Sequence, residues 1–315
     1  MPELSRSRFI IGSRRSRLAM AQSEVVAERV RTAWPGLVVE IVGVETEGDR
    51  SIDRPLPEIG GKGLFTAELE RRILRGEIDA AVHSLKDLPT DLAAGLCLAC
   101  VPERSDAADL LIRREGRGGL EDLPAGSVLG TSSLRRVAQL LARRPDCEVR
   151  SIRGNVETRL RKCRDGEYDA IILAAAGLRR LGLPHRHLAR LEPPEWLPAV
   201  GQGALGVEAR ASDEESARLL AAIESREART AVECERSLLA ALGGGCQIPV
   251  GAFAEVEGPR LRAAAAVFSP DGRVAIRDAL SGSAFEPAAI GRALAERLLE
   301  RGAGELLGRR ARDPR

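Results

Sequence analysis

Aromatic residues and lysines are scarce in this chain of 315 residues. Phe, Trp and Tyr together make up 3% of it, and the only lysines are Lys62, Lys86 and Lys162. The 48 basic residues nearly balance the 46 acidic ones, so the net charge is only +2. The chain therefore lacks the stacking rings and the broad basic field of a nucleic-acid-binding protein. Codon bias in a GC-rich genome explains the excess of arginine over lysine in the chain as a whole.

Long apolar runs and dense cysteine spacing are also missing. The longest apolar stretch, around residues 170–178, is about half of what a membrane-spanning helix needs, so we expect no membrane segment. The N-terminal sequence MPELSRSRF has no apolar core of a secretory signal. The six cysteines are not spaced as in a disulfide scaffold. We therefore predict a cytoplasmic protein with reduced thiols, large enough to bury two or three cores.

The sequence does contain two series of alternating strand and helix patterns. In the first series, strands are predicted over residues 8–13, 37–44, 78–84 and 96–101, and helices over residues 16–32 and 64–75. In the second, strands are predicted over residues 127–130, 148–152 and 168–174, and helices over residues 133–143 and 155–165. Such alternation is typical of mostly parallel α/β sheets.

A change of character near residue 225 predicts a third domain. The stretch LPAVGQGALGV at 197–207 is expected to cross back into the first sheet, so that two crossings make a hinged cleft. Beyond it lie a helical pattern at 229–242, a Gly-rich break, β-like runs with an SPDG turn, and a final helix at 287–301. The expected domains are residues 1–102 with 203–221 (α/β), residues 107–198 (α/β, arginine-rich), and residues 226–315 (smaller, α+β).

Both α/β series begin with glycine, hydroxyls and paired arginines where a strand enters a helix. The segments are GSRRS at 12–16 and GTSSLRR at 130–136, and RGNVETR at 153–159 holds a similar position. Free backbone N–H groups and the helix dipole attract anions there, and arginine forks add charged hydrogen bonds. Two facing anion sites are one interpretation. The other interpretation is that serine caps the helix N-terminus and the arginines are solvated. This second interpretation explains one of the two segments well, but it explains both together less well.

The segment HSLKDLPT at 83–90 follows a predicted strand, so its polar residues should lie at the carboxyl edge of the sheet. Asp87 is the candidate reactive carboxylate: beside Lys86 we expect it to be ionised, able to accept N–H bonds and stabilise a developing cation. A salt-bridged turn before Pro89 would explain the same residues. His83 can act as a base, but a lone histidine at a strand end more often has a structural role.

The loop GGGCQIPV places Cys246 after three glycines. Glycine permits backbone shapes that present a sulfur beside a bulky ligand, so a covalent role is plausible. Taken alone, the loop is better explained by a helix C-cap followed by a small buried cysteine. Cys97 and Cys100 have C-x-x-C spacing but lie in an apolar strand, so we interpret them as core residues and predict no metal site.

In combination, these segments resemble the porphobilinogen deaminase family over nearly the whole chain. Eight motifs occur in order: IGSRRSRLA near the start, GGKGLF at 60–65, HSLKDLPT at 83–90, GTSSLRR at 130–136, RGNVETRL at 153–160, AAAGLRRLG at 174–182, LPAVGQGALG at 197–206 and GGGCQIPVG at 243–251. The resemblance implies two periplasmic-binding-protein-like α/β domains around a cleft and a smaller α+β C-terminal domain.

The resemblance also implies an activity and a cofactor. The enzyme would be a transferase that joins four porphobilinogen molecules, with loss of four ammonia, into hydroxymethylbilane for haem biosynthesis. The growing chain would be built on a dipyrromethane cofactor held by a thioether to Cys246. Asp87 would contact pyrrole nitrogens and assist ammonia loss. A monomer is expected, with transient contact to the next pathway enzyme.

Each added pyrrole carries an acetate and a propionate, so the family pattern assigns a set of side chains to those carboxylates or to neutral hydrogen bonds. The set is Arg14, Ser16, Lys86, Ser133, Arg135, Arg136, Arg153, Arg159, Arg180 and Gln202. The stretch from 46 to 61 would be a mobile lid, with Lys62 and Phe65 at its base. The chain departs from the family pattern at Arg17, where many members have proline. It also departs at Glu58, a lid position where lysine is common, which puts a lid contact to substrate carboxylates in doubt.

Two other functions fit parts of the pattern. An anion-binding protein without catalytic chemistry explains the arginine-lined cleft but not GGGCQIPVG. A cysteine hydrolase or acyltransferase would need Cys246 within hydrogen-bond reach of His83, which the sequence does not support. Purified protein with a covalent adduct at Cys246 would decide between the binding protein and the polymerising enzyme.

Overall fold

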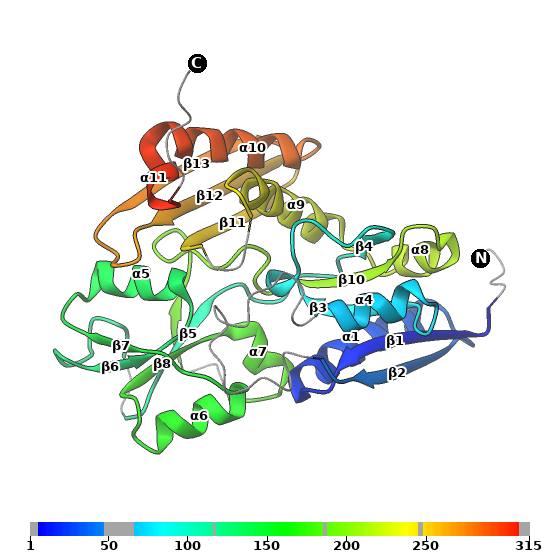
Figure 1. Ribbon diagram of the computed structural model, residues 1–315, viewed down its shortest axis with the longest axis horizontal. Helices are drawn as coiled ribbons and strands as arrows, with labels where there is room; N and C mark the ends of the chain where they lie inside the picture. Colours follow the sequence, from blue (N-terminus) through cyan, green and yellow to red (C-terminus); the bar gives the residue numbers. More distant parts are fainter. Residues whose placement is uncertain (1–5, 47–65, 116–117, 185–187, 245–247, 309–315) are drawn as a thin grey trace. The chain divides into compact units, whose positions relative to one another are not determined.

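The structure of the protein is a computed structural model that describes residues 6–46, 66–115, 118–184, 188–244 and 248–308 (Figure 1). The chain forms two compact units. Unit 1 comprises Met1–Ser105 and Ala204–Arg229, and unit 2 comprises Asp106–Gly203 and Thr230–Arg315. Within the described ranges, every helix is too short or too polar to cross a membrane.

Unit 1 is built on a mixed sheet that, in the described part of the chain, has five strands in the order β2-β1-β3-β10-β4. The strands are β1 (Arg8–Arg14), β2 (Val38–Val44), β3 (Ala80–Ser84), β4 (Leu96–Cys100) and β10 (Leu205–Arg210). Strands β2 and β3 run parallel to β1, and β10 lies antiparallel between β3 and β4. The returning chain therefore enters the sheet of unit 1 as an interior strand, between β3 and β4.

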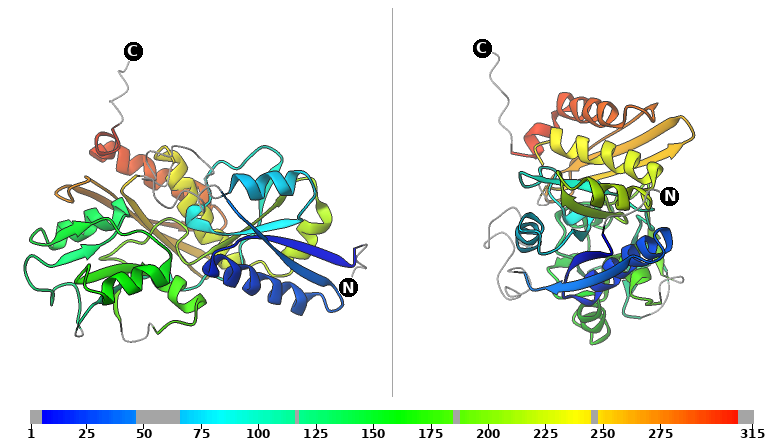
Figure 2. Two further views of the ribbon diagram at one scale, coloured as in Figure 1. Left: turned by 60° about the horizontal axis from the view of Figure 1, so that its bottom comes forward. Right: turned by 90° about the vertical axis from the view of Figure 1, so that its right-hand side faces the viewer.

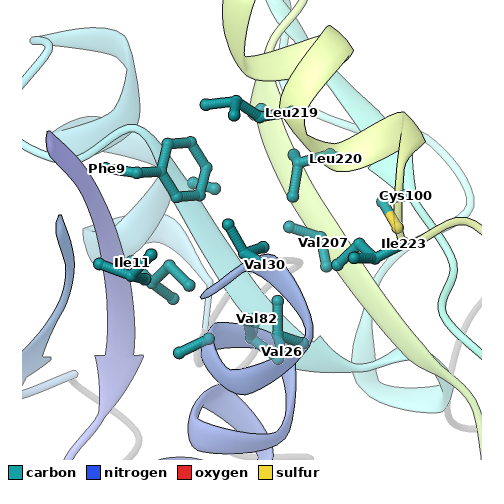
Figure 3. Packing of buried hydrophobic residues seen from close by; sticks show 14 of the residues in the cluster. Phe9, Ile11, Val26, Val30, Val82, Cys100, Val207, Leu219, Leu220 and Ile223 are labelled. Carbon is teal, nitrogen blue, oxygen red and sulfur yellow. The ribbon is translucent and has the colours of Figure 1, made fainter. Parts of the chain in front are cut away.

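The described helices of unit 1 are α1 (Arg17–Ala33), α4 (Ala67–Leu74), α8 (Glu214–Ala221) and the 3₁₀ turn η1 (Leu85–Asp87). The first two agree, within three residues at each end, with the helices predicted over residues 16–32 and 64–75. Helix α1 buries Val26 and Val30 in a core that also contains Phe9 and Ile11 of β1 (Figure 3). Leu219 and Leu220 of α8 and Val207 of β10 complete this core. Burial of these side chains fixes the register of α1 and β1, and thereby the position of the turn between them.

Unit 2 contains a second sheet with the same arrangement. Its described strands lie in the order β7-β6-β8-β5-β9. They are β5 (Asp109–Arg113), β6 (Val128–Gly130), β7 (Glu148–Arg150), β8 (Ala170–Ala174) and β9 (Ala189–Leu191). Here too the first three strands are parallel, and the strand next to the chain crossing, β5, is antiparallel to β8. Its helices are α5 (Leu134–Arg143), α6 (Val156–Arg164) and α7 (Ala175–Arg180).

The remaining residues form an antiparallel sheet packed against two helices, and Figure 2 shows these helices beside the strands. The elements are α9 (Arg226–Ala241), β11 (Val250–Glu257), β12 (Arg260–Phe268), β13 (Ala275–Ser283), α10 (Pro287–Leu298), the π-helix η2 (Leu299–Ala303) and α11 (Gly304–Leu306). One face of β12 packs on α9 and α10 through Ala265 and Val267. The other face packs on Ala138 of α5 through Ala266 and Phe268.

The α/β class and the smaller C-terminal α+β part are confirmed. The expected SPDG turn is present, because the Gly272 amide donates to the Ser269 carbonyl at 3.0 Å and Gly272 has a φ of +73°. Strands β5 and β9 and helices α7 and α8 were not predicted. Residues 102–109 were interpreted as a connection, so the apolar run that follows them was missed as a strand. The boundaries of three separate domains stay a prediction.

Candidate active site

The turn after β1 and the turn after β3 bring three predicted site residues together in unit 1. Strands β1 and β3 are parallel neighbours, so their carboxyl ends meet at one edge of the sheet. A pocket of about 80 Å³ opens there. It is lined by Arg14, Ser16, Leu18, Ala19, Gln22, Thr66, Val82, His83, Ser84 and Asp87.

The two turns that carry these residues are held by local hydrogen bonds. Ser16 is the N-cap of α1, and its side chain accepts from the Ala19 amide at 3.2 Å. Gln22, one turn further along α1, donates to Ser84 Oγ at 2.7 Å. The capping interpretation therefore holds for Ser16, although Ser16 also lines the pocket. Asp87 ends η1 with an exposed side chain, so its carboxylate is accessible from the pocket.

His83 lies deeper than Asp87 and faces a buried carboxylate. Its Nε2 is 3.2 Å from Glu208 Oε2, and the two side chains are 5% and 0% exposed. Glu208 comes from β10, which pairs with β3, so the returning strand supplies this partner. The two groups lie within ion-pair distance but form no hydrogen bond, so the structural role that the sequence favoured for His83 stays a prediction. Glu208 was not predicted.

A second cluster, at the start of α5 in unit 2, contains Arg135 and Arg136. Both side chains are buried, and both donate to one carboxylate, that of Asp109. Arg135 Nη1 lies 2.9 Å from Asp109 Oδ2, and Arg136 Nη2 lies 2.6 Å from Oδ1. Burial alone would raise the pKa of Asp109, but the two guanidiniums outweigh it and hold that pKa well below its usual range. Burial lowers the pKa of Arg135 despite this pairing.

Asp109 also accepts hydrogen bonds from two neutral side chains. Trp196 Nε1 donates to Oδ2 at 2.8 Å, and Gln202 Nε2 donates to Oδ1 at 2.8 Å. Gln202 was predicted as a neutral hydrogen-bond donor in the site, and it lies in this cluster. Asp109 and Trp196 were missed. The only sequence signal for Asp109 was an acidic residue at the head of an apolar run.

The start of α6 positions two further predicted arginines in unit 2. Asn155 is the N-cap and accepts from the Thr158 amide at 2.8 Å. Arg159 Nε donates to the Gly154 carbonyl at 2.8 Å, and Gly154 has a φ of +109°, which favours glycine. Arg153 and Arg159 are half-buried. Each residue therefore keeps part of its surface exposed.

Arg180, at the end of α7, is held by a backbone group. Its Nη2 donates to the Gly203 carbonyl at 2.7 Å. Burial and then the neighbouring Arg179 lower the pKa of Arg180 to about 10. Among the described residues no carboxylate forms an ion pair with it.

The other predicted site residues either make few described contacts or lie outside the described residues. Ser133 precedes α5 but makes no side-chain capping bond within that helix start, so the capping interpretation does not hold there. Lys86 lies on η1 and is half-buried. Cys246, Lys62, Phe65 and Glu58 lie outside the described residues. The described cysteines Cys97, Cys100, Cys147, Cys163 and Cys234 are free thiols.

Unit 1 has an exposed carboxylate and Arg14 at the edge of an α/β sheet, and unit 2 has buried arginines at the start of a helix, side chains of a kind that suits carboxylate-bearing ligands. Comparison with known families gives the particular family. Residues 9–218 match the family model "Porphobilinogen deaminase, dipyromethane cofactor binding domain", and residues 229–300 match "Porphobilinogen deaminase, C-terminal domain". The chain belongs to the porphobilinogen deaminase family.

Curated relatives agree over nearly their full length. The porphobilinogen deaminase of Roseiflexus sp. (strain RS-1) is 50% identical over 95% of this chain and 98% of the relative. That of Chromobacterium violaceum is 49% identical over 98% and 99%, and that of Desulforudis audaxviator is 51% identical over 96% and 98%. The protein is thus a transferase of tetrapyrrole biosynthesis that polymerises porphobilinogen, and it carries a dipyrromethane cofactor.

Solved structures of low sequence identity were also found. A YaeC-family lipoprotein from Enterococcus faecalis V583 is 17% identical, with a TM-score of 0.42 over 70% of this chain and 92% of that one. Substrate-binding domain 2 of GlnP from Lactococcus lactis is 12% identical, with a TM-score of 0.42 over 70% and 90%.

Proposed function

We propose that the polymerisation of porphobilinogen takes place at the unit 1 pocket, with Asp87 as the catalytic carboxylate and Cys246 as the attachment point of the primer. The observation that supports this most is the meeting of Arg14, Ser16 and Asp87 at the carboxyl edge of one sheet. Arg14 and Asp87 are 73 positions apart in the sequence, and the parallel pairing of β1 and β3 brings them to one pocket.

Asp87 acts on the pyrrole nitrogen of porphobilinogen. The aminomethyl group leaves from its protonated, ammonium form: as the carbon–nitrogen bond breaks, the departing ammonia takes the electron pair and the positive charge passes to the ring system. The Asp87 carboxylate accepts the pyrrole N–H and stabilises this charge electrostatically. Because the side chain is exposed at the pocket, it reaches the substrate without a large rearrangement.

The arginines hold the acetate and propionate groups. Arg135 Nε and Arg136 Nε are buried and have no acceptor among the described residues. Arg180 likewise has no ion pair with a described carboxylate. Buried guanidinium donors of this kind are costly unless a ligand completes them. Carboxylates are the ligands that arginine forks fit best, so this donor set suits a carboxylate-bearing dipyrromethane. Lys86, Ser133, Arg153, Arg159 and Gln202 are assigned to the same task.

When bound, the dipyrromethane supplies the pyrrole carbon that attacks the activated substrate. The protein's own contribution is to hold the dipyrromethane in a fixed position. The packing of the strand that follows Cys246 in the sequence supports this role. Strand β11 begins four residues after the cysteine, and its Gly251 packs tightly on Leu197 and Arg135. A methyl group on Gly251 would lie 2.7 Å from Leu197 Cβ and 3.4 Å from Arg135 Cδ. Strand β11, which follows Cys246 in the sequence, therefore packs against Arg135 of the arginine cluster.

Intact-mass measurement of the purified holoenzyme tests the attachment. We expect the mass of the chain plus one dipyrromethane, and a mapped adduct on the Cys246 peptide. Cys246→Ser should lose the adduct, whereas Cys97→Ser, at a described cysteine that is only partly buried, should keep it. An unmodified wild-type protein from a porphobilinogen-producing host would contradict the proposal and favour an anion-binding protein.

We infer further that the enzyme works as a cytoplasmic monomer, which the free thiols of the described cysteines support. Lys62 and Phe65 are assigned to the base of a lid, and a transient contact with the next pathway enzyme is expected. Light scattering on the purified protein tests the monomer: a stable dimer at micromolar concentration would overturn it.

A further inference from the structure

We propose that Asp109 is a positioning residue for Arg135 and Arg136: its carboxylate sets the distance and direction of both guanidiniums before a ligand carboxylate binds. The inference rests on the proposed role of these arginines. Asp109 touches neither substrate nor cofactor in this proposal and acts through the two arginines.

Asp109 is saturated by donors from three parts of unit 2. Each carboxylate oxygen receives one bond from an arginine and one from a neutral side chain, Trp196 on Oδ2 and Gln202 on Oδ1. An ionised carboxylate has about four acceptor positions, so these four bonds use them all. A carboxylate bound in this way cannot turn, and the two arginines are fixed with it.

The two arginines use only part of their hydrogen-bonding capacity inside the protein. Arg135 Nη1 also donates to the Leu197 carbonyl at 2.8 Å, and Arg136 Nη1 donates to the Ile172 carbonyl at 3.0 Å. All these bonds come from the Nη atoms. The Nε atoms of both side chains are buried without an acceptor in the described part of the chain. One end of each guanidinium is therefore anchored, while the Nε hydrogen is left for another acceptor.

The charge of the cluster points to the same conclusion. Two guanidiniums and one carboxylate leave an excess of one positive charge, and all three side chains are at most 8% exposed. An uncompensated charge in such a site is unfavourable. One further carboxylate would balance it. Asp109 thus keeps two mutually repelling cations together and leaves the cluster in need of one anion.

The location of Asp109 explains how the position is held. It is the first residue of β5, just after the chain enters unit 2, and Gln202 lies just before the chain leaves it. Gln202 Nε2 also donates to the Ala107 carbonyl at 2.8 Å. A hydrogen bond therefore joins the segment that enters unit 2 to the segment that leaves it. The amide of Gly201, the residue before Gln202, donates to Glu235 Oε2 at 2.7 Å, so the backbone beside Gln202 is held as well.

The test compares Asp109→Asn with Asp213→Asn in holoenzyme. Asp213 is a matched control, because its carboxylate also joins two arginines, Arg6 and Arg210, but lies at α8 in unit 1. Three quantities are measured: the melting temperature, the fraction of chains that carry the primer by intact mass, and KM and kcat for porphobilinogen. We expect both variants to melt lower. Only Asp109→Asn should lose a large part of the primer-carrying fraction and raise KM roughly tenfold.

Equal behaviour of the two variants, with lower stability but wild-type primer loading and KM, would overturn the inference and leave the proposed function intact. A wild-type protein without any adduct would instead overturn the proposed function. If Asp109→Asn does not fold, Trp196→Phe decides, since it removes one donor to Asp109 and keeps an aromatic ring. It should raise KM in the same direction by a smaller factor, and an unchanged KM would again overturn the inference.

Discussion

Gly291 of α10 lies directly against the carbonyl oxygen of Cys234 in α9: a methyl group built on Gly291 would be 2.2 Å from that oxygen. The obstacle is backbone, so it cannot move aside as a flexible side chain would. Gly291→Ala should therefore push the two helices apart and destabilise the C-terminal part by about 1–3 kcal/mol, the usual cost of overpacking. Thermal unfolding measures this, with exposed Arg292→Ala as the control; equal melting temperatures would contradict the close contact.

Asp87 is exposed, so its removal should cost little stability. We expect Asp87→Ala to keep the fold and the wild-type melting temperature within roughly 2 °C but to lose nearly all turnover, because nothing then stabilises the cation formed on ammonia loss. Steady-state assay and circular dichroism together check this. Asp91→Ala, four residues on and also exposed, is the control and should retain activity. Substantial turnover by the Asp87 variant would refute its catalytic role.

Arg180 carries a charge that burial disfavours. Because its folded pKa is lowered to about 10 from 12.5, the charged form costs stability at all pH values below about 10, and the cost disappears as pH rises toward 12.5. Arg180→Met should therefore raise the melting temperature at pH 7 while it raises KM roughly tenfold through loss of a charged hydrogen bond to substrate. Its exposed neighbour serves as the comparison: Arg179→Met should leave KM unchanged. A wild-type KM in the Arg180 variant would remove this arginine from the binding set.

Asp213 predicts an acid-sensitive contribution to stability. Burial would raise its pKa, but hydrogen bonds from Ser216 and the charges of Arg6 and Arg210 lower it to about 2, from an ordinary value of 3.8. A lowered carboxylate pKa stabilises the fold above pH 3.8, and this stabilisation is lost as pH falls through 2. Asp213→Asn keeps a good N-cap residue and should cost about 1 kcal/mol near neutral pH. Urea unfolding from pH 6 to pH 2.5 should show the difference from wild type shrinking; a constant difference would exclude the linkage.

Local patterns in the sequence were enough to predict most helices and strands. Capping of α1 by Ser16, one of the two interpretations of that segment, is observed, and Asn155, where a helix was predicted to begin, is the N-cap of α6. The meeting of Arg14 with Asp87 could also be predicted, because parallel strands end at a common edge and the motifs directly follow those strands. Such inferences depend on neighbours in the chain and on the periodicity of apolar residues.

Long-range partners needed the tertiary structure. Asp109 lies 26 residues from Arg135 and 93 from Gln202, and nothing in the local sequence indicates that one carboxylate accepts from both. The same is true of Glu208, which meets His83 only because the returning strand β10 pairs with β3. The sequence by itself determined the family, the α/β alternation and the types of chemical group available. Only the tertiary structure decided which arginines share a buried carboxylate and which have no carboxylate partner in the described chain. The reason is that burial and charge pairing depend on segments that are distant in the sequence and meet only in the fold.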